Sequence, residues 1–276
     1  MIGKIIKIIS DDFTIKLSNN DIITTKARGI FRNKKISTLV GDNVQVDIEK
    51  KIITKIENRK NSLIRPPVSN IDQALIVTSS VNPDFSSNLL DKMLNIIEYN
   101  NIKPIIIITK YDLLKNTSYI DSIINYYKSI GYEVYKNSEL SKIKKLFNGK
   151  VTILTGQTGV GKSTLINKIG NMNLKTNEIS KALGRGKHTT RHVELYDLFD
   201  GLIADTPGFS SLSFINMTKE DIRDNFIEFN NYKDKCKYRD CNHINEDDCE
   251  IKRKVKDNTI LKERYDNYIK FISEKK

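Results

Sequence analysis

A glycine-rich octapeptide between an apolar run and a helical pattern constrains the fold of this chain more than any other feature. Residues 156–163 read GQTGVGKS and fit the pattern G-x-x-x-x-G-K-[ST], directly after VTILT and directly before STLINKI. A loop of this kind joins a buried strand to a helix. Further apolar runs, which include ALIVTS, PIIIIT, YEVY and LIAD, alternate with helical patterns from about residue 71 to 215. We therefore expect an α/β domain with a mostly parallel sheet.

The residue types in the octapeptide suit the binding of phosphate. Glycines let backbone N–H groups wrap phosphate oxygens, the Lys162 ammonium neutralises the β- and γ-phosphates, and the Ser163 hydroxyl is a ligand for Mg²⁺. An accidental glycine-rich turn is the alternative, and the flanking strand and helix argue against it. We expect nucleotide contacts, with Lys162 also catalytic, from Gly156, Gln157, Thr158, Gly159, Val160, Gly161, Lys162, Ser163 and Thr164.

A second motif closes the apolar run LIAD. Asp205-Thr206-Pro207-Gly208 places a carboxylate where it can hold Mg²⁺ and a Gly208 N–H where it can meet the γ-phosphate, so Gly208 is counted as catalytic. Taken alone, such a tetrapeptide is often an ordinary β-turn. Its place at the carboxyl end of a strand favours the functional interpretation.

The base of the nucleotide is indicated by a motif that follows PIIIIT. Thr109-Lys110-Tyr111-Asp112 resembles the [NT]KxD motif of GTPases, with Thr109 in place of the commoner Asn. The Asp112 carboxylate can accept hydrogen bonds from guanine N1–H and from its exocyclic amine, and adenine offers no such donor pair. Ser138, after YEVY, resembles the short Ser-Ala motif that supports guanine, although Glu139 replaces the Ala. GTP is favoured; an ATPase or a nucleotide kinase is the alternative enzyme.

The segment before LIAD carries candidate switch residues. Residues 184–195 read GRGKHTTRHVEL, and Thr189 or Thr190 is expected to give Mg²⁺ a second hydroxyl ligand, with Thr190 also catalytic. Phe209 stands where many GTPases place a water-orienting Gln, so intrinsic hydrolysis should be slow. We expect docking on a partner to order this loop and bring His188, or a group of the partner, to the attacking water.

The order of the motifs is unusual. In most GTPases the phosphate loop comes first and the guanine motif last, but here Asp112 precedes Gly156. A doubly wound sheet tolerates this circular permutation, because joining old termini and opening a surface loop keeps neighbours together. The segment after Asp205 then leads towards the C-terminal part of the chain, so nucleotide state could move that part.

The three cysteines of the chain lie in one short window that also contains a histidine. Cys236-x4-Cys241-x-His243-x5-Cys249 offers three thiolates and one imidazole, enough for a closed tetrahedral zinc site. The alternative is three unligated cysteines near a surface histidine. We expect one structural Zn²⁺, and we do not expect His188 or His192 to be ligands.

The flanking segments complete a multidomain interpretation. Residues 1–65 hold five short alternating runs and predict a small β-barrel of the OB type, with an SH3-like barrel as the alternative. Arg65-Pro66-Pro67 stiffens a linker. We expect a GTPase domain over residues 66–215 and a small helical zinc-binding domain over residues 216–276.

The charge of the chain points to a polyanionic partner. Lys and Arg outnumber Asp and Glu by 46 to 34, and the net charge is +12. A solvated lysine-rich surface is the alternative. Contact with RNA is favoured by two basic clusters that flank the GTPase region: Arg28, Arg32, Lys34 and Lys35 around Phe31, and IKRKVK followed by Lys262 and Arg264. Ile251, Val255, Tyr265, Tyr268 and Phe271 are expected to pack one side of a helix.

No run of apolar residues is long enough for a transmembrane helix, and the N-terminus lacks the features of a signal peptide. A cytoplasmic protein without membrane contact is expected. Nothing in the sequence suggests a dimerisation heptad, so a monomer is expected as well.

Together these motifs resemble those of the bacterial, circularly permuted GTPases of the RsgA (YjeQ) type, which depend on the small ribosomal subunit. The likeness covers essentially the whole chain and is carried by RGIFRNKK, VGDNVQV, RPPVSNIDQALIV, TKYDLL, GQTGVGKSTLIN, GRGKHTTRHVEL, DTPGF and the cysteine cluster.

The resemblance implies an OB-fold, a permuted GTPase domain and a zinc-binding domain that act in late maturation of the small ribosomal subunit. It implies the small subunit and its 16S-type rRNA as partners and GTP, GDP and Mg²⁺ as ligands, with hydrolysis stimulated by the subunit. A nucleic-acid-binding module with a vestigial phosphate loop is the non-enzymatic alternative, and the presence of Lys162, Ser163, Thr189 and Asp205 argues against it.

Overall fold

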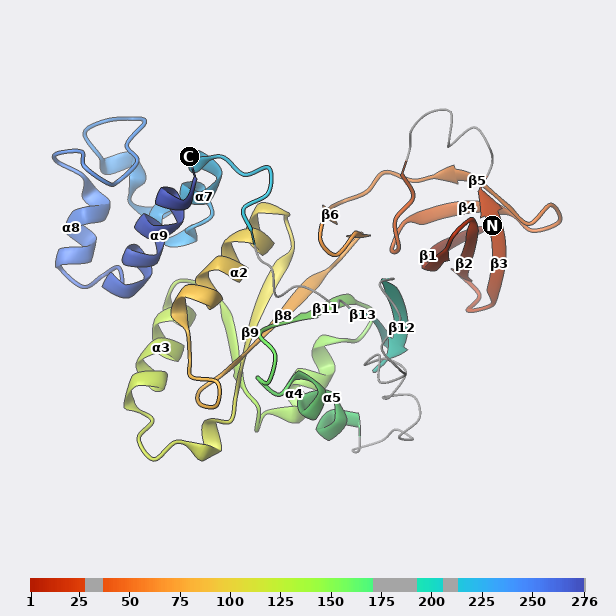
Figure 1. Ribbon diagram of the computed structural model, residues 1–276, viewed down its shortest axis with the longest axis horizontal. Helices are drawn as coiled ribbons and strands as arrows, with labels where there is room; N and C mark the ends of the chain where they lie inside the picture. Colours follow the sequence, from red (N-terminus) through yellow and green to blue (C-terminus); the bar gives the residue numbers. More distant parts are fainter. Residues whose placement is uncertain (28–36, 171–192, 206–212, 276) are drawn as a thin grey trace. The chain divides into compact units, whose positions relative to one another are not determined.

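The computed structural model describes residues 1–27, 37–170, 193–205 and 213–275, and it forms two compact units. The first unit contains Met1–Leu75 and Asn137–Ser210, and the second contains Ile76–Lys136 and Ser211–Lys276. The chain passes from one to the other within strand β8, Gln73–Ser79 (Figure 1).

The N-terminal strands of the first unit form a five-stranded barrel. They are β1 (Ile2–Ile9), β2 (Asp12–Leu17), β3 (Ile22–Ala27), β4 (Asn43–Asp47) and β5 (Ile52–Ile56). Their pairing order β1-β2-β3-β5-β4 closes through β1 and β4, and only the β3–β5 pair is parallel. This five-stranded closed order confirms the OB-type prediction over the SH3-like alternative. Alternate residues fill the interior, because successive side chains of a strand point to opposite faces: Ile5, Phe13, Ile15, Leu17, Val44, Val46 and Ile53.

A buried aspartate ties the barrel to the segment that follows it. The Asp42 carboxylate accepts hydrogen bonds from the Arg59 guanidinium at 2.6 and 2.8 Å and from the Ser69 hydroxyl at 2.6 Å. Gly41 precedes it with φ +95°, and a Cβ there would lie 2.1 Å from the Ser69 carbonyl oxygen. The close approach therefore requires glycine. Two short strands follow, β6 (Ser62–Leu63) and β7 (Val68–Ser69), with Arg65-Pro66 between them.

Three further strands of the first unit extend from the barrel. Strand β11 (Val151–Thr155) pairs in parallel with β13 (Gly201–Asp205), and β12 (Glu194–Leu198) forms an antiparallel hairpin with β13. Strand β12 reaches β1 of the barrel, where the Lys7 ammonium lies 2.8 Å from the Glu194 carboxylate. Helices α4 (Leu140–Leu146) and α5 (Lys162–Gly170) flank β11 in the chain and pack against each other.

The second unit begins with β8, β9 (Lys103–Thr109) and β10 (Glu133–Lys136), of which β9 is central and pairs in parallel with β10. Helices α2 (Ser87–Tyr99) and α3 (Ser118–Ser129) connect them. The side chains of β8 are buried throughout, as expected for a strand covered on both faces.

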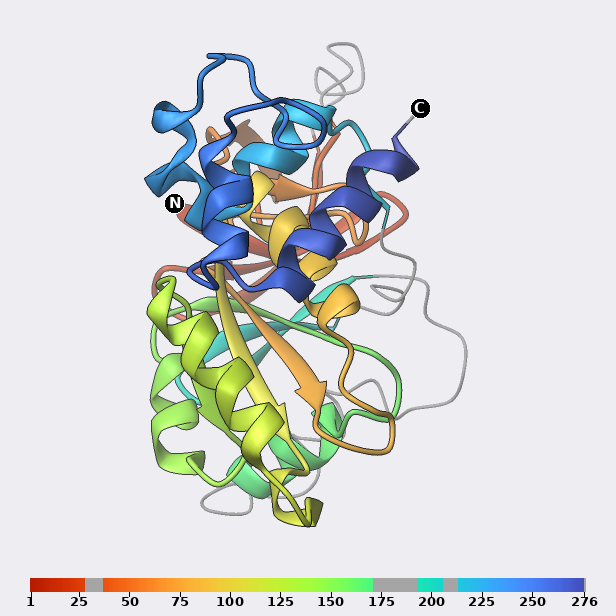
Figure 2. The same ribbon diagram turned by 90° about the vertical axis from the view of Figure 1, so that its left-hand side faces the viewer.

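The C-terminal segment of this unit is helical, as the sequence predicts. It contains α7 (Lys219–Asp224), η2 (Ile227–Asn231), η3 (Lys233–Lys235), α8 (Glu250–Lys256) and α9 (Lys262–Glu274). Thr218 and Asp221 form a capping box at the start of α7. Ile251, Tyr268 and Phe271 are buried in a core that also contains Ile96 of α2. Helix α9 runs beside α2, joined by a hydrogen bond from Asn88 to Asn267 (Figure 2).

Arg264 of α9 corrects one sequence-based expectation. Its side chain is 1% exposed and is therefore not part of a basic surface. Its guanidinium bonds Asp91 and Glu228, and the Phe226 ring lies 4.8 Å from its central carbon. Among the described residues, no helix is long and apolar enough to cross a membrane.

Candidate functional site

The glycine-rich loop follows β11 and leads directly into α5. Gly156, Gly159 and Gly161 have φ values of 138°, 83° and 95°, a region that side-chain-bearing residues rarely adopt. Helix α5 begins at Lys162, so the free N–H groups of its first turn face the same loop. This arrangement of backbone donors at a helix N-terminus suits an anion.

Lys162 lies over the loop that it follows. Its ammonium donates hydrogen bonds to the carbonyl oxygens of Gly156 at 2.6 Å and Gln157 at 2.8 Å. Burial lowers the pKa of Lys162. The structure thus holds this cation at the turn where the sequence predicts phosphate contacts, with Ser163 and Thr164 in the first turn of the helix.

Asp205 ends β13, the strand that pairs in parallel with β11. The register places Ile153 beside Ala204, so the carboxyl ends of both strands lie at one edge of the sheet. The backbone of Asp205 therefore lies at the same edge as the phosphate loop. His188, Thr189, Thr190 and Gly208 lie outside the described residues, as do Arg28, Arg32, Lys34 and Lys35 of the barrel.

The guanine motif stands at the end of β9 in the second unit. Thr109 is buried, and its hydroxyl donates to the Thr78 carbonyl oxygen at 3.2 Å. Lys110 adopts φ 57°, and its ammonium bonds the Asn82 carbonyl oxygen. This turn brings Asp112 to the surface in η1 (Tyr111–Leu113). Thr109 thus connects β9 to β8, a role that its hydroxyl can fill in place of an Asn amide.

Two residues that the sequence did not point to, Asp121 and Lys136, contact Tyr111 of this motif. The Tyr111 hydroxyl donates to the Asp121 carboxylate at 2.8 and 2.9 Å, and the Lys136 ammonium lies 3.6 Å from the centre of the Tyr111 ring. Lys136 also pairs with Asp121 at 3.0 Å. Neither residue belongs to a local motif, because the cluster forms only when α3 and β10 come together. Ser138 is exposed in the turn after β10.

The four predicted zinc ligands come together in the second unit. Their donor atoms in Cys236, Cys241, His243 and Cys249 all lie within 4.8 Å of one another. Nδ1 of His243 is 3.3 Å from Cys249 Sγ and 3.6 Å from Cys236 Sγ, and the two sulfurs are 3.9 Å apart. Zn–S bonds of about 2.3 Å in a tetrahedron separate two sulfurs by about 3.8 Å. The donor set and its spacing fit a tetrahedral zinc ion.

Burial prepares these groups for a metal. It lowers the pKa of His243 from 6.5 to about 4, so the imidazole is neutral at pH 7 and needs to lose no proton to bind. Burial raises the pKa of Cys241 to about 12, so this thiol would release its proton to solvent only when a cation binds its sulfur. The Tyr265 hydroxyl holds the turn by donating to the His243 carbonyl oxygen at 2.6 Å.

Two known protein families match most of this chain. Residues 56–215 match the family described as RsgA GTPase, and residues 2–54 match the RsgA N-terminal domain. The chain belongs to the RsgA GTPase family. The family predicted from the sequence motifs is thereby confirmed.

Relatives within the RsgA family match over nearly their full length. The chain is 47% identical to small ribosomal subunit biogenesis GTPase RsgA 2 of Oceanobacillus iheyensis, over 99% of this chain and 96% of that protein. It is 45% identical to small ribosomal subunit biogenesis GTPase RsgA of Bacillus subtilis, with the same coverage.

Two solved structures share the fold. YloQ, described as a circularly permuted GTPase, matches with a TM-score of 0.84 and 38% identity over 99% of this chain and 94% of that one. YjeQ from Thermotoga maritima matches with a TM-score of 0.86 and 29% identity over 99% and 97%. Together with the barrel and the Cys/His cluster of this chain, these neighbours confirm the predicted fold class, a barrel followed by a permuted GTPase region and a helical C-terminal segment.

Proposed function

We propose that this protein binds the small ribosomal subunit and couples the hydrolysis of GTP to GDP and phosphate to late maturation of that subunit. The observation that carries the proposal is the joint presence of the phosphate loop and the TKYD motif in a chain that matches RsgA proteins end to end. The proposed domains are the barrel over 1–65, the GTPase domain over 66–215 and the zinc-binding domain over 216–276.

In the proposed nucleotide site, one motif binds the base and the other binds the phosphates. Thr109 to Asp112, supported by Ser138, select guanine, and the loop from Gly156 to Thr164 holds the phosphates. Mg²⁺ would be held by Ser163, Asp205 and Thr189 or Thr190, and it would neutralise charge on the β- and γ-phosphate oxygens. Lys162, Thr190 and Gly208 are the proposed catalytic contacts. The amine of Lys162 is already held beside the loop by Gly156 and Gln157.

Slow intrinsic hydrolysis follows from the residue after Gly208. Phe209 offers no hydrogen bond to the attacking water. We propose that docking on the small subunit supplies the missing group, either His188 of this chain or a group of the ribosomal particle.

The Cys236, Cys241, His243 and Cys249 cluster is proposed to hold one structural Zn²⁺. Four protein ligands leave no open position for a substrate, so the ion would stabilise the fold of the C-terminal segment. The close spacing of the four donor atoms supports this role.

The proposed partners follow from charge and from the family. The net charge of +12 suits 16S-type rRNA, and work on ribosomal particles implies a cytoplasmic protein. We propose a monomer that makes no membrane contact.

Steady-state GTP turnover with and without purified small subunits tests the function. We expect slow turnover alone and a marked increase with small subunits, whereas large subunits serve as the control and should give none. Competition of labelled GTP by GTP and by ATP checks the base. Equal turnover with and without small subunits would remove the ribosome-dependent part of the proposal.

Sedimentation gives an independent measurement. The protein should pellet with small subunits in a non-hydrolysable GTP analogue and should be released in GDP. Equal binding to small subunits in GDP and in the GTP analogue would contradict a nucleotide-dependent switch.

A further inference from the structure

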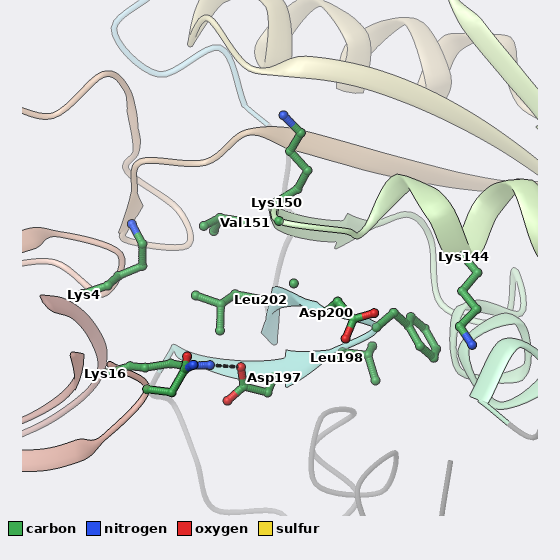
Figure 3. A pocket seen from close by; sticks show the side chains of 13 residues that line it. Lys4, Lys16, Lys144, Lys150, Val151, Asp197, Leu198, Asp200 and Leu202 are labelled. Atoms are coloured by element: carbon green, nitrogen blue, oxygen red, sulfur yellow. Dashed lines mark hydrogen bonds and ion pairs between the residues drawn. The ribbon is translucent and has the colours of Figure 1, made fainter. Parts of the chain in front are cut away.

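A basic cavity lies in the first unit away from the phosphate loop. It has a volume of about 1000 Å³ and opens between strands of the barrel and the turn that joins β12 to β13 (Figure 3). Val151, the first residue of β11, lines it, whereas the phosphate loop follows the last residue of that strand. A five-residue strand separates the two places by about 13 Å, so the cavity is distinct from the nucleotide site.

Lysines dominate the charge of the cavity. Four lysines and two aspartates line it, a formal charge of +2: Lys4, Lys16, Lys144, Lys150, Asp197 and Asp200. Figure 3 shows Lys4 and Lys16 on the barrel side and Lys144 and Lys150 on the other side. Their ammonium groups are spread round the cavity and do not converge on one point. This spacing suits several linked anions better than one small anion.

The lysines on the barrel side already have partners. The Lys4 ammonium donates to the Gly41 carbonyl oxygen at 3.1 Å and to Asn43 Oδ1 at 2.8 Å, and Lys16 forms an ion pair with Asp197. These bonds hold the barrel wall of the cavity in place.

The lysines on the other side are available. Among residues 1–27, 37–170, 193–205 and 213–275, neither Lys144 nor Lys150 has an ion-pair or hydrogen-bond partner for its ammonium, and Lys144 lies only near the Phe199 ring at 5.8 Å. Asp72, the acid whose pKa Lys150 helps to lower, is paired with Lys60. Two uncompensated cations at the wall of a cavity raise the local positive potential and attract anions.

The backbone that carries these two lysines is firmly held. The Gly149 N–H donates to the Asp200 carbonyl oxygen at 2.8 Å, and the Leu202 N–H donates to the Lys150 carbonyl oxygen at 2.9 Å. The rings of Phe147 and Phe199 meet edge to face with centroids 5.3 Å apart. The site is therefore formed by packed structure and not by a loose surface loop.

The lining favours phosphate over a base. Lysine binds phosphate as a point charge, and the aromatic ring in the lining, Phe199, is buried and cannot stack on a nucleobase. We propose that this cavity binds consecutive backbone phosphates of RNA. The choice of RNA as the source of the phosphates rests on the proposed function, whereas the anion site itself does not.

Binding of a short, fluorescein-labelled single-stranded RNA, measured by anisotropy over a range of salt concentrations, tests the proposal. The variant is the full chain with Lys144→Glu and Lys150→Glu. Loss of two phosphate contacts should lower the slope of log affinity against log salt by about 1.4 and weaken binding severalfold at low salt. The matched control carries Lys145→Glu, on the same helix as Lys144, and Lys128→Glu on α3; neither residue lines the cavity, and the change in charge is the same.

The outcomes separate the possibilities. A slope that falls in the cavity variant and not in the control supports the proposal, and equal slopes overturn it. Competition by tripolyphosphate forms the second arm: lysine-dependent binding of tripolyphosphate with unchanged RNA binding would overturn the assignment to RNA. Lys144→Gln with Lys150→Gln provides a milder variant, and thermal unfolding confirms that each protein is folded.

The same measurements are independent of the proposed function. RNA binding is measured without GTP turnover. If the cavity variant binds RNA like the native protein, the proposal of subunit-stimulated hydrolysis is unaffected. Conversely, if the rate of GTP turnover is the same with and without small subunits, the proposal of a lysine-dependent anion site is unaffected.

Discussion

Arg264 and Asp91 form a buried ion pair, with Nη1 and Oδ1 2.5 Å apart, that joins α9 to α2. Glu228 binds the other side of the guanidinium, at 2.5 Å from Nε. Asp91 also accepts hydrogen bonds from the Tyr127 hydroxyl and the Asn267 amide. Burial alone would lower the pKa of Arg264, but the carboxylates of Glu228 and Asp91 outweigh it and hold the pKa well above its usual value. The C-terminal helix is thus fixed to residues far away in the chain.

Replacing Arg264 with Met should destabilise the second unit. The change leaves the buried carboxylates of Asp91 and Glu228 without their cation, and such losses cost about 3–5 kcal/mol. Urea unfolding measures the free energy, and Lys262→Met, on the exposed side of α9, is the control with an expected change below about 0.5 kcal/mol. Equal stability of the two variants would contradict a structural role for the pair.

Lys162→Ala should abolish most of the GTP turnover. The variant removes the ammonium held at the phosphate loop, and loss of one group that stabilises the transition state lowers the rate by about a hundredfold or more. Phosphate release with saturating GTP is the measurement. Lys168→Ala on the exposed side of the same helix should turn over at the normal rate, and a similar loss there would point to damage to α5 instead.

Asp112→Asn should change the base that is recognised. The amide can no longer accept two hydrogen bonds from guanine N1–H and the exocyclic amine, so GTP affinity should fall by about a hundredfold. Xanthosine triphosphate carries a carbonyl group in place of that amine and should bind better to the variant than to the native protein. Isothermal titration with both nucleotides checks the switch. Unchanged GTP affinity would exclude Asp112 from the base site.

The cluster of Cys236, Cys241, His243 and Cys249 predicts that the protein contains zinc and that a ligand variant does not. The native protein should contain one zinc ion per chain, and His243→Asn should lose it and unfold at a lower temperature. The matched variant His192→Asn should keep the ion, because no cysteine lies near His192 in the sequence and we do not expect it to be a ligand. Acid should release the ion, since thiolates take up protons. A native protein that keeps its stability in a strong chelator would count against a structural zinc.

Gly201→Ala should disturb the turn that lines the basic cavity. A Cβ at this position would lie 2.0 Å from the Phe147 carbonyl oxygen and 2.8 Å from that of Lys150, and both are backbone atoms that cannot rotate away. Overpacking of this kind costs about 1–3 kcal/mol. Gly149→Ala separates crowding from backbone strain, because Gly149 has φ +64° and nothing lies within 4 Å of the position that its Cβ would take. Thermal unfolding should show the larger loss for Gly201→Ala.

Much of the candidate site was predictable because its signals are local. The phosphate loop requires glycines at positive φ directly between a strand and a helix, and GQTGVGKS displays that requirement in eight consecutive residues. The four zinc donors likewise lie in one window, so their clustering needed only a short folded turn. The barrel strands were visible from their alternation, whereas their closed pairing order was not, since an OB barrel and an SH3-like barrel share that period.

The sequence by itself determined the family, and it predicted the phosphate loop, the guanine motif and the four clustered Cys and His side chains, because each motif is a pattern of neighbouring residues. Only the tertiary structure decided that Arg264 is a buried cation and that Lys4, Lys16, Lys144 and Lys150 line one cavity. A basic residue looks the same in sequence whether it faces water or a carboxylate. Its burial and its partners depend on segments far along the chain, which only folding brings into contact.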